Sequence, residues 1–177
     1  MTIKKKLCSF LAASVPFLSS CAGTPRNAAP VQNFDKEKYL GKWYEVARFD
    51  LSFERNLSNT SAEYTLRDDG YIRVKNRGFN DVKQKWSEVE GKAKFTGSDN
   101  VAALKVSFYG PFYGEYNVVA LDSAYTYALI AGGSLKYLWI LSRTKDIPAG
   151  VKTAYLEKAT AMGYDVSKLI WVRQDRE

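Results

Sequence analysis

Residues 60–77, TSAEYTLRDDGYIRVKNR, decide the fold class of this chain. Apolar and polar side chains alternate on both sides of Asp68-Asp69-Gly70, and a period of two is typical of strands that bury one face. Gly70 can adopt the positive φ that a tight turn requires. The stretch therefore predicts an antiparallel hairpin made of strands at 60–67 and 71–77.

The same alternation recurs along the chain and predicts six further strands. They are expected at 43–49, 85–95, 101–108, 115–122, 127–131 and 137–142. Eight antiparallel strands with short turns favour an all-β, up-and-down barrel, because closure leaves no strand with an unpaired edge. An eight-stranded barrel is also about the size that can hold one small ligand.

One helix is expected after the eighth strand. Pro148 suits a first helical position, and Gly163 suits the residue just past a helix end. The apolar residues between them have helical spacing, which predicts a face that packs against the barrel wall: Val151, Ala154, Tyr155, Ala159 and Met162. Residues 166–172 are expected to form a short final strand along the barrel edge.

The first 32 residues have the pattern of a signal peptide followed by a lipid-attachment segment. Three lysines at 4–6 precede an apolar run at 7–18 that is too short to span a bilayer, as in a secretory signal peptide. Leu18-Ser19-Ser20-Cys21 resembles a lipobox, in which the cysteine thiol receives a diacylglycerol. An ordinary signal with a chance cysteine is the alternative. We expect a signal peptide at 1–20, a lipidated tether at 21–32 and the barrel domain at 33–177.

The composition excludes several function classes. The chain has no His, so it cannot build a Ser-His-Asp triad, a His-ligated zinc site or a His-ligated haem. Its two cysteines, Cys8 and Cys21, leave the barrel domain without a thiol nucleophile. Without the three lysines at 4–6, the formal net charge falls from +7 to +4, which is too small for a nucleic-acid footprint.

No catalytic arrangement is visible among the acidic residues. Glu45, Glu63, Glu88 and Glu90 lie in expected strands without a recognisable pairing. We therefore expect no enzyme activity, no metal and no cofactor.

Three short motifs lie at these strand positions. Gly41-Lys42-Trp43 begins the first strand, Ala120-Leu121-Asp122 lies at the end of the sixth, and Arg143 ends the eighth. Together they resemble the three motifs of the lipocalins, although that family often has Thr where Leu121 stands. The resemblance implies that Trp43 and Arg143 meet at the closed end of the barrel. It thus gives Gly41, Trp43, Asp122 and Arg143 structural roles.

Longer stretches resemble one branch of that family. Residues 43–49, 64–70, 105–114 and 137–143 are similar to the bacterial outer-membrane lipoprotein lipocalins and their apolipoprotein D-like relatives. The likeness covers roughly residues 33–172. It implies a lipid-anchored protein of the outer membrane of a Gram-negative bacterium, to which Ala22 after the lipobox cysteine also points. A homodimer is possible.

The resemblance implies a lumen that holds a fatty acid or a lysophospholipid, and alternation predicts which side chains line it. The inward strand positions are Ala62, Tyr64, Leu66, Val74, Leu104, Val106, Tyr116, Val118, Ala120, Tyr137, Trp139 and Leu141. Phe112 and Tyr113 lie in a glycine-flanked loop that could either cover an acyl chain or form a rigid turn. The competing interpretation is a structural or chaperone-like envelope protein whose barrel is filled by its own aromatic side chains.

Overall fold

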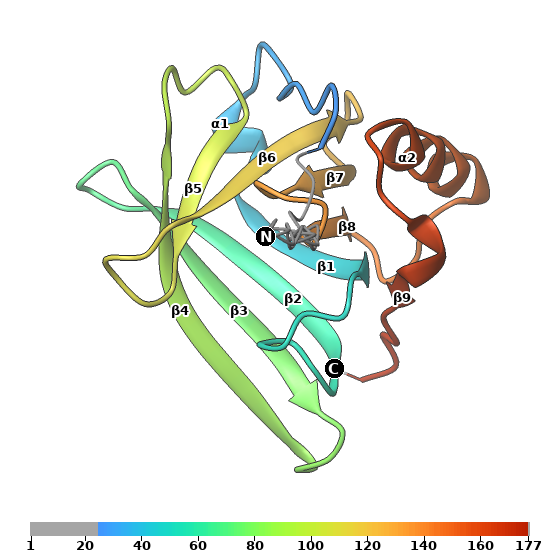
Figure 1. Ribbon diagram of the computed structural model, residues 1–177. Helices are drawn as coiled ribbons and strands as arrows, with labels where there is room; N and C mark the ends of the chain where they lie inside the picture. Colours follow the sequence, from blue (N-terminus) through green and yellow to red (C-terminus); the bar gives the residue numbers. More distant parts are fainter. Residues whose placement is uncertain (1–24, 177) are drawn as a thin grey trace, which may run out of the picture.

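Eight antiparallel strands follow one another around a closed barrel in the computed structural model, which describes residues 25–176 (Figure 1). Each strand pairs with its neighbour in the chain, and β1 closes the barrel by pairing with both β2 and β8. This confirms the predicted fold class. The strands are β1 (Gly41–Arg48), β2 (Leu57–Leu66), β3 (Ile72–Asn80), β4 (Lys85–Phe95), β5 (Ala103–Ser107), β6 (Gly114–Leu121), β7 (Tyr127–Ala131) and β8 (Leu138–Ser142).

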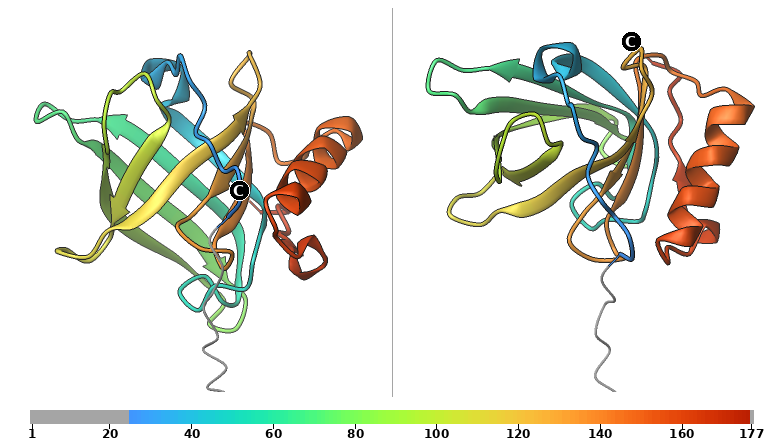
Figure 2. Two further views of the ribbon diagram at one scale, coloured as in Figure 1. Left: turned by 45° about the horizontal axis from the view of Figure 1, so that its top comes forward. Right: turned by 90° about the horizontal axis from the view of Figure 1, so that it is seen from above.

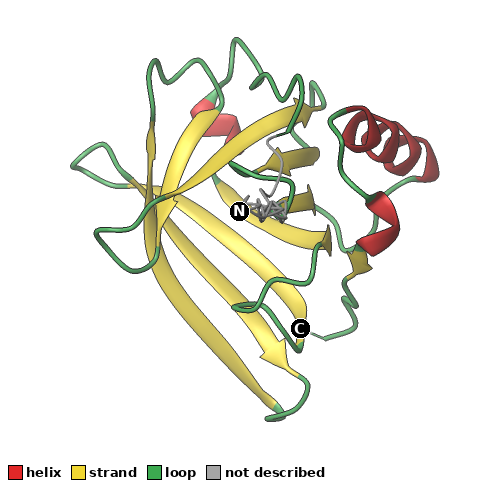
Figure 3. Cartoon of the chain, in the orientation of Figure 1, coloured by secondary structure: helices red, strands yellow, loops and turns green. Residues whose placement is uncertain are grey.

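The helix packs on the outside of the barrel, beside β1, β7 and β8 (Figure 3). It is α2, Ala149–Ala161, and Pro148 is its N-cap rather than its first residue. Gly163 adopts a φ of +95°, the left-handed conformation that ends many helices. Tyr155, Ala159 and Met162 are buried against the barrel, whereas Ala154 is exposed.

The expected final strand at 166–172 is wrong in extent. Residues 166–168 form a 3₁₀ turn, because the Asp165 carboxylate accepts a hydrogen bond from the Ser167 amide. Only β9, Ile170–Trp171, is a strand, and it pairs with the end of β1.

A one-turn helix precedes the barrel and was not expected from the sequence. This helix, α1, spans Lys36–Tyr39 and begins at Asp35, whose carboxylate accepts a hydrogen bond from the Lys38 amide at 3.2 Å. It places the buried Tyr39 ring across one end of the barrel. That end is therefore closed, and the loops β1–β2, β3–β4, β5–β6 and β7–β8 surround the other end, the mouth.

Part of the expected tether packs on the barrel. Residues 25–32 run along the outer wall, where the Arg26 amide donates to the Met162 carbonyl and the Val31 amide donates to that of Val118, both at 2.9 Å. Figure 2 shows this segment running from the mouth side towards the closed end. Cys21 and the expected signal peptide lie outside the described residues.

Candidate functional site: the barrel lumen

The closed end of the lumen is sealed by Arg143 and Trp43. The guanidinium lies over the indole ring, 3.9 Å from its centre, and donates hydrogen bonds to the carbonyls of Lys42 (2.7 Å) and Lys38 (2.8 Å). Gly41 has a φ of +90° and brings the backbone within reach of Arg143. The contact between Trp43 and Arg143 is the one implied by the resemblance, and it lies across the closed end of the barrel. That these residues have a purely structural role stays a prediction.

The second motif forms a turn at the same end. The Asp122 carboxylate accepts hydrogen bonds from the backbone amides of Ala124 (3.2 Å), Thr126 (2.7 Å) and Tyr127. It thereby fixes the β6–β7 connection.

Three tyrosines and one phenylalanine make the floor above this plug. The hydroxyl of Tyr116 lies 2.6 Å from that of Tyr39 and 2.9 Å from that of Tyr64. Burial raises the pKa of all three hydroxyls, so they remain neutral hydrogen-bonding groups. The ring of Phe34 packs against Tyr39. The floor therefore consists mainly of apolar ring atoms, and its three tyrosine hydroxyls are already hydrogen-bonded to one another.

Most of the residues expected to line the lumen belong to its interior cluster. Alternation along the strands holds where the ladders are regular, so these side chains share one face with Trp43. The buried ones are Tyr64, Val74, Leu104, Val118 and Leu141, and the partly buried ones are Ala62, Val106, Tyr116 and Trp139. Their role as ligand contacts stays a prediction.

Ala120 was expected to face inward, and the structure corrects this. The register of β6 against β7 shifts between Val118 and Ala120, so an extra residue is inserted at this point. Ala120 therefore packs in the cluster beside α2, and Leu121 takes the inward position.

Leu66, Phe112 and Tyr113 do not line the lumen. Leu66 is 47% exposed because it ends β2 at the closed end, beyond the described residues that cover the rest of the strand. Phe112 is 79% exposed at a loop tip. The Tyr113 ring packs on the outer wall, 5.2 Å from Nζ of Lys94. Tyr137 precedes β8 at the mouth, 38% exposed and stacked on Trp139.

A buried ionic cluster occupies the mouth side of the lumen, and it was not expected from the sequence. Glu45 and Arg48 come from the end of β1, and Glu54 comes from the β1–β2 loop; all three are at most 9% exposed. Nε of Arg48 lies 2.9 Å from Oε1 of Glu45 and 3.7 Å from Oε2 of Glu54. Trp139 donates its indole N–H to Oε2 of Glu54 at 3.2 Å.

Two carboxylates share a single guanidinium in this cluster. Arg48 also donates to the carbonyls of Glu54 and Leu57, both at 2.9 Å, which holds the β1–β2 loop against the barrel. Burial raises the pKa of Glu45 well above its ordinary value, and the neighbouring Glu54 carboxylate raises it further. Burial also raises the pKa of Glu54. The cluster is therefore poised to hold a proton or a second positive group.

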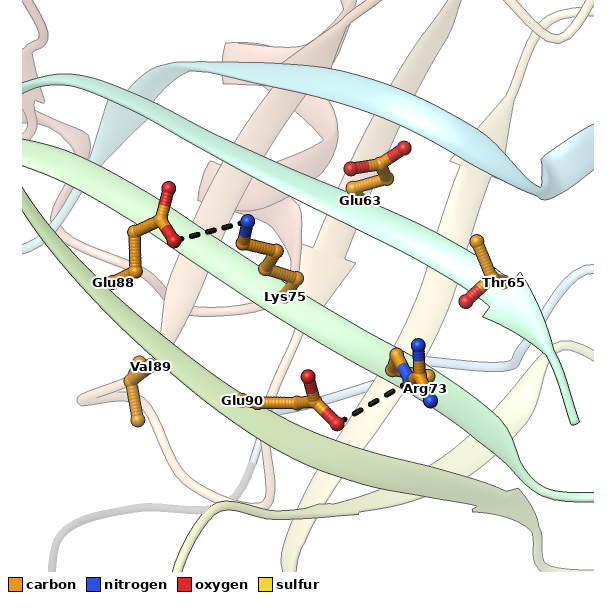
Figure 4. Close-up of a pocket in the computed structure, with 7 residues that line it drawn as sticks. All are labelled: Glu63, Thr65, Arg73, Lys75, Glu88, Val89 and Glu90. Carbon is orange, nitrogen blue, oxygen red and sulfur yellow. Dashed lines mark ion pairs between the residues drawn. The ribbon is translucent and has the colours of Figure 1, made fainter.

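A hollow also lies on the outer wall of the barrel, away from the lumen. It has a volume of about 520 Å³ and crosses β2, β3 and β4 (Figure 4). Its charges are satisfied by exposed ion pairs, Arg73 with Glu90 at 3.3 Å and Lys75 with Glu88 at 2.9 Å. Exposed pairs of this kind contribute little to stability. We interpret this hollow as a solvated wall and the lumen as the candidate site.

Within residues 25–176, no group of three or more His, Cys, Asp or Glu side chains could hold a metal ion. No helix in the same range is long and apolar enough to cross a membrane.

Comparison with known proteins identifies the family. The family model described as "Lipocalin-like domain" matches residues 34–174. The outer membrane lipoprotein Blc of Escherichia coli (strain K12) is 54% identical over 166 residues, covering 92% of this chain and 94% of the relative. Apolipoprotein D of Rattus norvegicus is 32% identical over 149 residues, covering 79% and 77%.

Solved structures agree on the fold alone. Lobster apocrustacyanin A1 superposes with a TM-score of 0.68 at 15% identity, covering 92% of this chain and 94% of that one. The barrel order, the Trp43–Arg143 plug and the sequence matches lead to one assignment. This chain belongs to the lipocalin family, within its group of bacterial outer membrane lipoproteins.

Proposed function

We propose that this lipoprotein is anchored through lipid on Cys21 and that its barrel holds an amphiphile such as a fatty acid or a lysophospholipid. The observation that carries the proposal is that several inward-facing side chains remain partly exposed. They belong to different strands of the barrel wall: Ala62, Asn76, Val89, Val106 and Trp139. A barrel filled by its own side chains would bury these positions, so their exposure favours an open lumen.

The order of side chains along the lumen supports one orientation of the ligand. Aliphatic side chains, among them Val74 and Leu141, share the interior cluster with the aromatic floor at the closed end, whereas the ionic cluster lies at the mouth. An acyl tail gains free energy by burial against such walls, whereas a polar head needs hydrogen-bonding groups. We place the tail towards the floor and the head beside Glu45, Arg48 and Glu54.

The polar groups of the lumen favour a head that donates hydrogen bonds. The ionic cluster has more carboxylate than guanidinium groups, and Oδ1 of Asn76 has no hydrogen-bond partner among the described residues. A third carboxylate, from a fatty acid, would be repelled by Glu45 and Glu54, whereas hydroxyl or ammonium groups would be attracted. Of the two classes, we therefore favour a lysophospholipid whose head carries ammonium or hydroxyl groups beyond its anionic phosphate, with those groups towards the two carboxylates.

Fluorescence titration of the delipidated barrel tests the proposal. Trp139 lines the lumen, whereas Trp86 lies on the outer wall under Arg77, 3.7 Å away. Lysophosphatidylethanolamine should change the emission saturably, with a lower Kd than a fatty acid of the same chain length. The change should disappear in Trp139→Phe and persist in Trp86→Phe, while calorimetry still detects binding by both variants. Absence of saturable binding of either lipid would support the filled barrel instead.

A further inference from the structure

Large apolar side chains are exposed on all four loops that surround the mouth. Phe53 is on β1–β2 and Val82 on β3–β4, at 63% and 73% exposure, and Tyr137 is on β7–β8. Tyr109 and Phe112 share β5–β6, at 75% and 79%. Single exposed apolar residues are ordinary, but a set distributed around one opening marks an interaction surface. We call these five residues the mouth ring.

Positive charge accompanies the mouth ring. Lys83 and Lys136 lie on two of these loops, and Lys85 begins β4 beside them. None of the three forms an ion pair within residues 25–176. Among the exposed acidic side chains that the structure describes on the mouth loops and at the adjoining strand ends, Glu115 is the one without an ion pair. The loop carboxylate Asp81 is already paired with Arg173 at 2.6 Å. Aromatic and aliphatic tips among free ammonium groups suit the headgroup layer of a bilayer with anionic lipid.

The start of the described chain also lies at this end of the barrel. The Arg26 amide is bonded to the Met162 carbonyl, and a Cβ on the adjacent Gly163 would lie 3.7 Å from Leu135 of the β7–β8 loop. Cys21 precedes Pro25 by four residues, which span at most about 14 Å. A lipid on Cys21 would therefore be held near the mouth.

We propose that the mouth of the barrel docks on a phospholipid bilayer, with the mouth ring in the headgroup layer. An amphiphile would then pass between membrane and lumen without crossing bulk water. The argument from the tether rests on the proposed lipidation of Cys21, whereas the argument from the mouth ring does not. A second copy of the chain could also cover apolar loops, but the lysines of the two copies would face one another there, which disfavours it.

Site-specific quenching tests the docked orientation. In the full lipidated chain the introduced cysteine is the free thiol, because Cys21 is acylated and Cys8 leaves with the signal peptide. A polarity-sensitive fluorophore is placed at Phe53→Cys or Phe112→Cys, and at Leu66→Cys as the matched exposed apolar position of the closed end. The proteins are reconstituted in vesicles of phosphatidylethanolamine and phosphatidylglycerol. Nitroxide-labelled lipid should quench the two mouth probes. The emission of the Leu66→Cys probe should stay equal to its emission in lipid-free buffer.

Three results would overturn docking through the mouth. They are equal quenching at both ends, absence of quenching at the mouth, and mouth probes that are protected from quenching as the protein dimerises. A transfer assay adds a second measurement, in which Phe53→Ser/Phe112→Ser should load lysophospholipid from vesicles several-fold more slowly than Leu66→Ser. Its affinity for the same lipid in solution should be unchanged. If lipid binding fails in solution while the mouth probes are still quenched, the proposed ligand is wrong and the docking stands.

Discussion

Replacing Arg48 by methionine removes the one positive charge of the buried ionic cluster at nearly constant volume. Arg48 is 2% exposed, and its guanidinium faces Glu45 and Glu54 while donating to two backbone carbonyls. The variant leaves two carboxylates in an apolar lumen without a counter-charge. Breaking a buried ion pair from one side costs roughly 3–5 kcal/mol, so we expect a loss of about 4 kcal/mol at pH 7. That is a large fraction of the stability of a domain.

The loss should depend on pH, with a sign fixed by the pKa shifts. The pKa of Glu45 in the folded chain already lies above its ordinary value of 4.5, and removing Arg48 raises it further. A raised carboxyl pKa means that the folded state binds the extra proton, so stability falls as the pH rises from 4.5 through the folded pKa. At pH 5 both carboxyls of Arg48→Met carry a proton for a larger share of the time than at pH 7, because the pKa of each is raised. The loss should then shrink to about 1–2 kcal/mol, the contribution of the missing hydrogen bonds.

Urea denaturation followed by circular dichroism at pH 5 and pH 7 measures these differences. The double variant Glu45→Gln/Arg48→Met should recover part of the lost stability at pH 7, because it removes one of the two carboxylates that Arg48→Met leaves without a counter-charge. Arg55→Met is the matched control, since Arg55 pairs with Asp50 on the surface, and it should change stability little at either pH. A loss in Arg48→Met that is below 1 kcal/mol, or that is the same at both pH values, would refute the reasoning.

Two further substitutions test the packing around the lumen. Arg143→Met removes the donor that serves several carbonyls of the closed end and the cation over Trp43, and should cost about 3 kcal/mol by urea denaturation. A loss no larger than that of Arg55→Met would contradict its role as a plug. Gly91→Ala places a Cβ 2.5 Å from the Ser107 carbonyl oxygen and 2.6 Å from the Phe108 ring, and should cost about 1–3 kcal/mol. Wild-type stability for Gly91→Ala would show that β4 and β5 separate without strain.

The regular part of the barrel could be predicted from residue patterns because alternation and turn chemistry agree there. In the 60–77 hairpin, Tyr64 pairs with Val74 and Gly70 adopts a φ of +80°. The prediction of the final strand was wrong because the Asp165 side chain accepts a hydrogen bond from the Ser167 amide. A period-two pattern of apolar residues does not show such a local hydrogen bond. The helix α1 is a single turn, too short for its periodicity to be visible.

Lumen residues could be predicted where the ladder is regular and not at strand ends or loops. Val74 and Leu104 lie in uninterrupted pairings, so parity places them correctly. Leu66 has the correct parity, yet it extends beyond the part of the barrel that covers it. The prediction for Phe112 depended on the path of the β5–β6 loop, which the alternation of residues along strands does not determine.

The ionic cluster was missed because it depends on an irregularity in β1. Residues three apart in a regular strand point to opposite faces, so Glu45 and Arg48 should be separated by the barrel wall. The register of β1 against β8 shifts between Glu45 and Ala47, and this shift brings both side chains into the lumen while Ala47 packs towards α2. One chemical signal remains in the sequence. Two opposite charges, Glu45 and Arg48, interrupt the otherwise apolar stretch 43–49. Opposite charges in a buried strand are expected to pair, because a buried charge without a partner is strongly destabilising. A bulge that makes them neighbours is therefore the arrangement that lets this strand be buried on both faces.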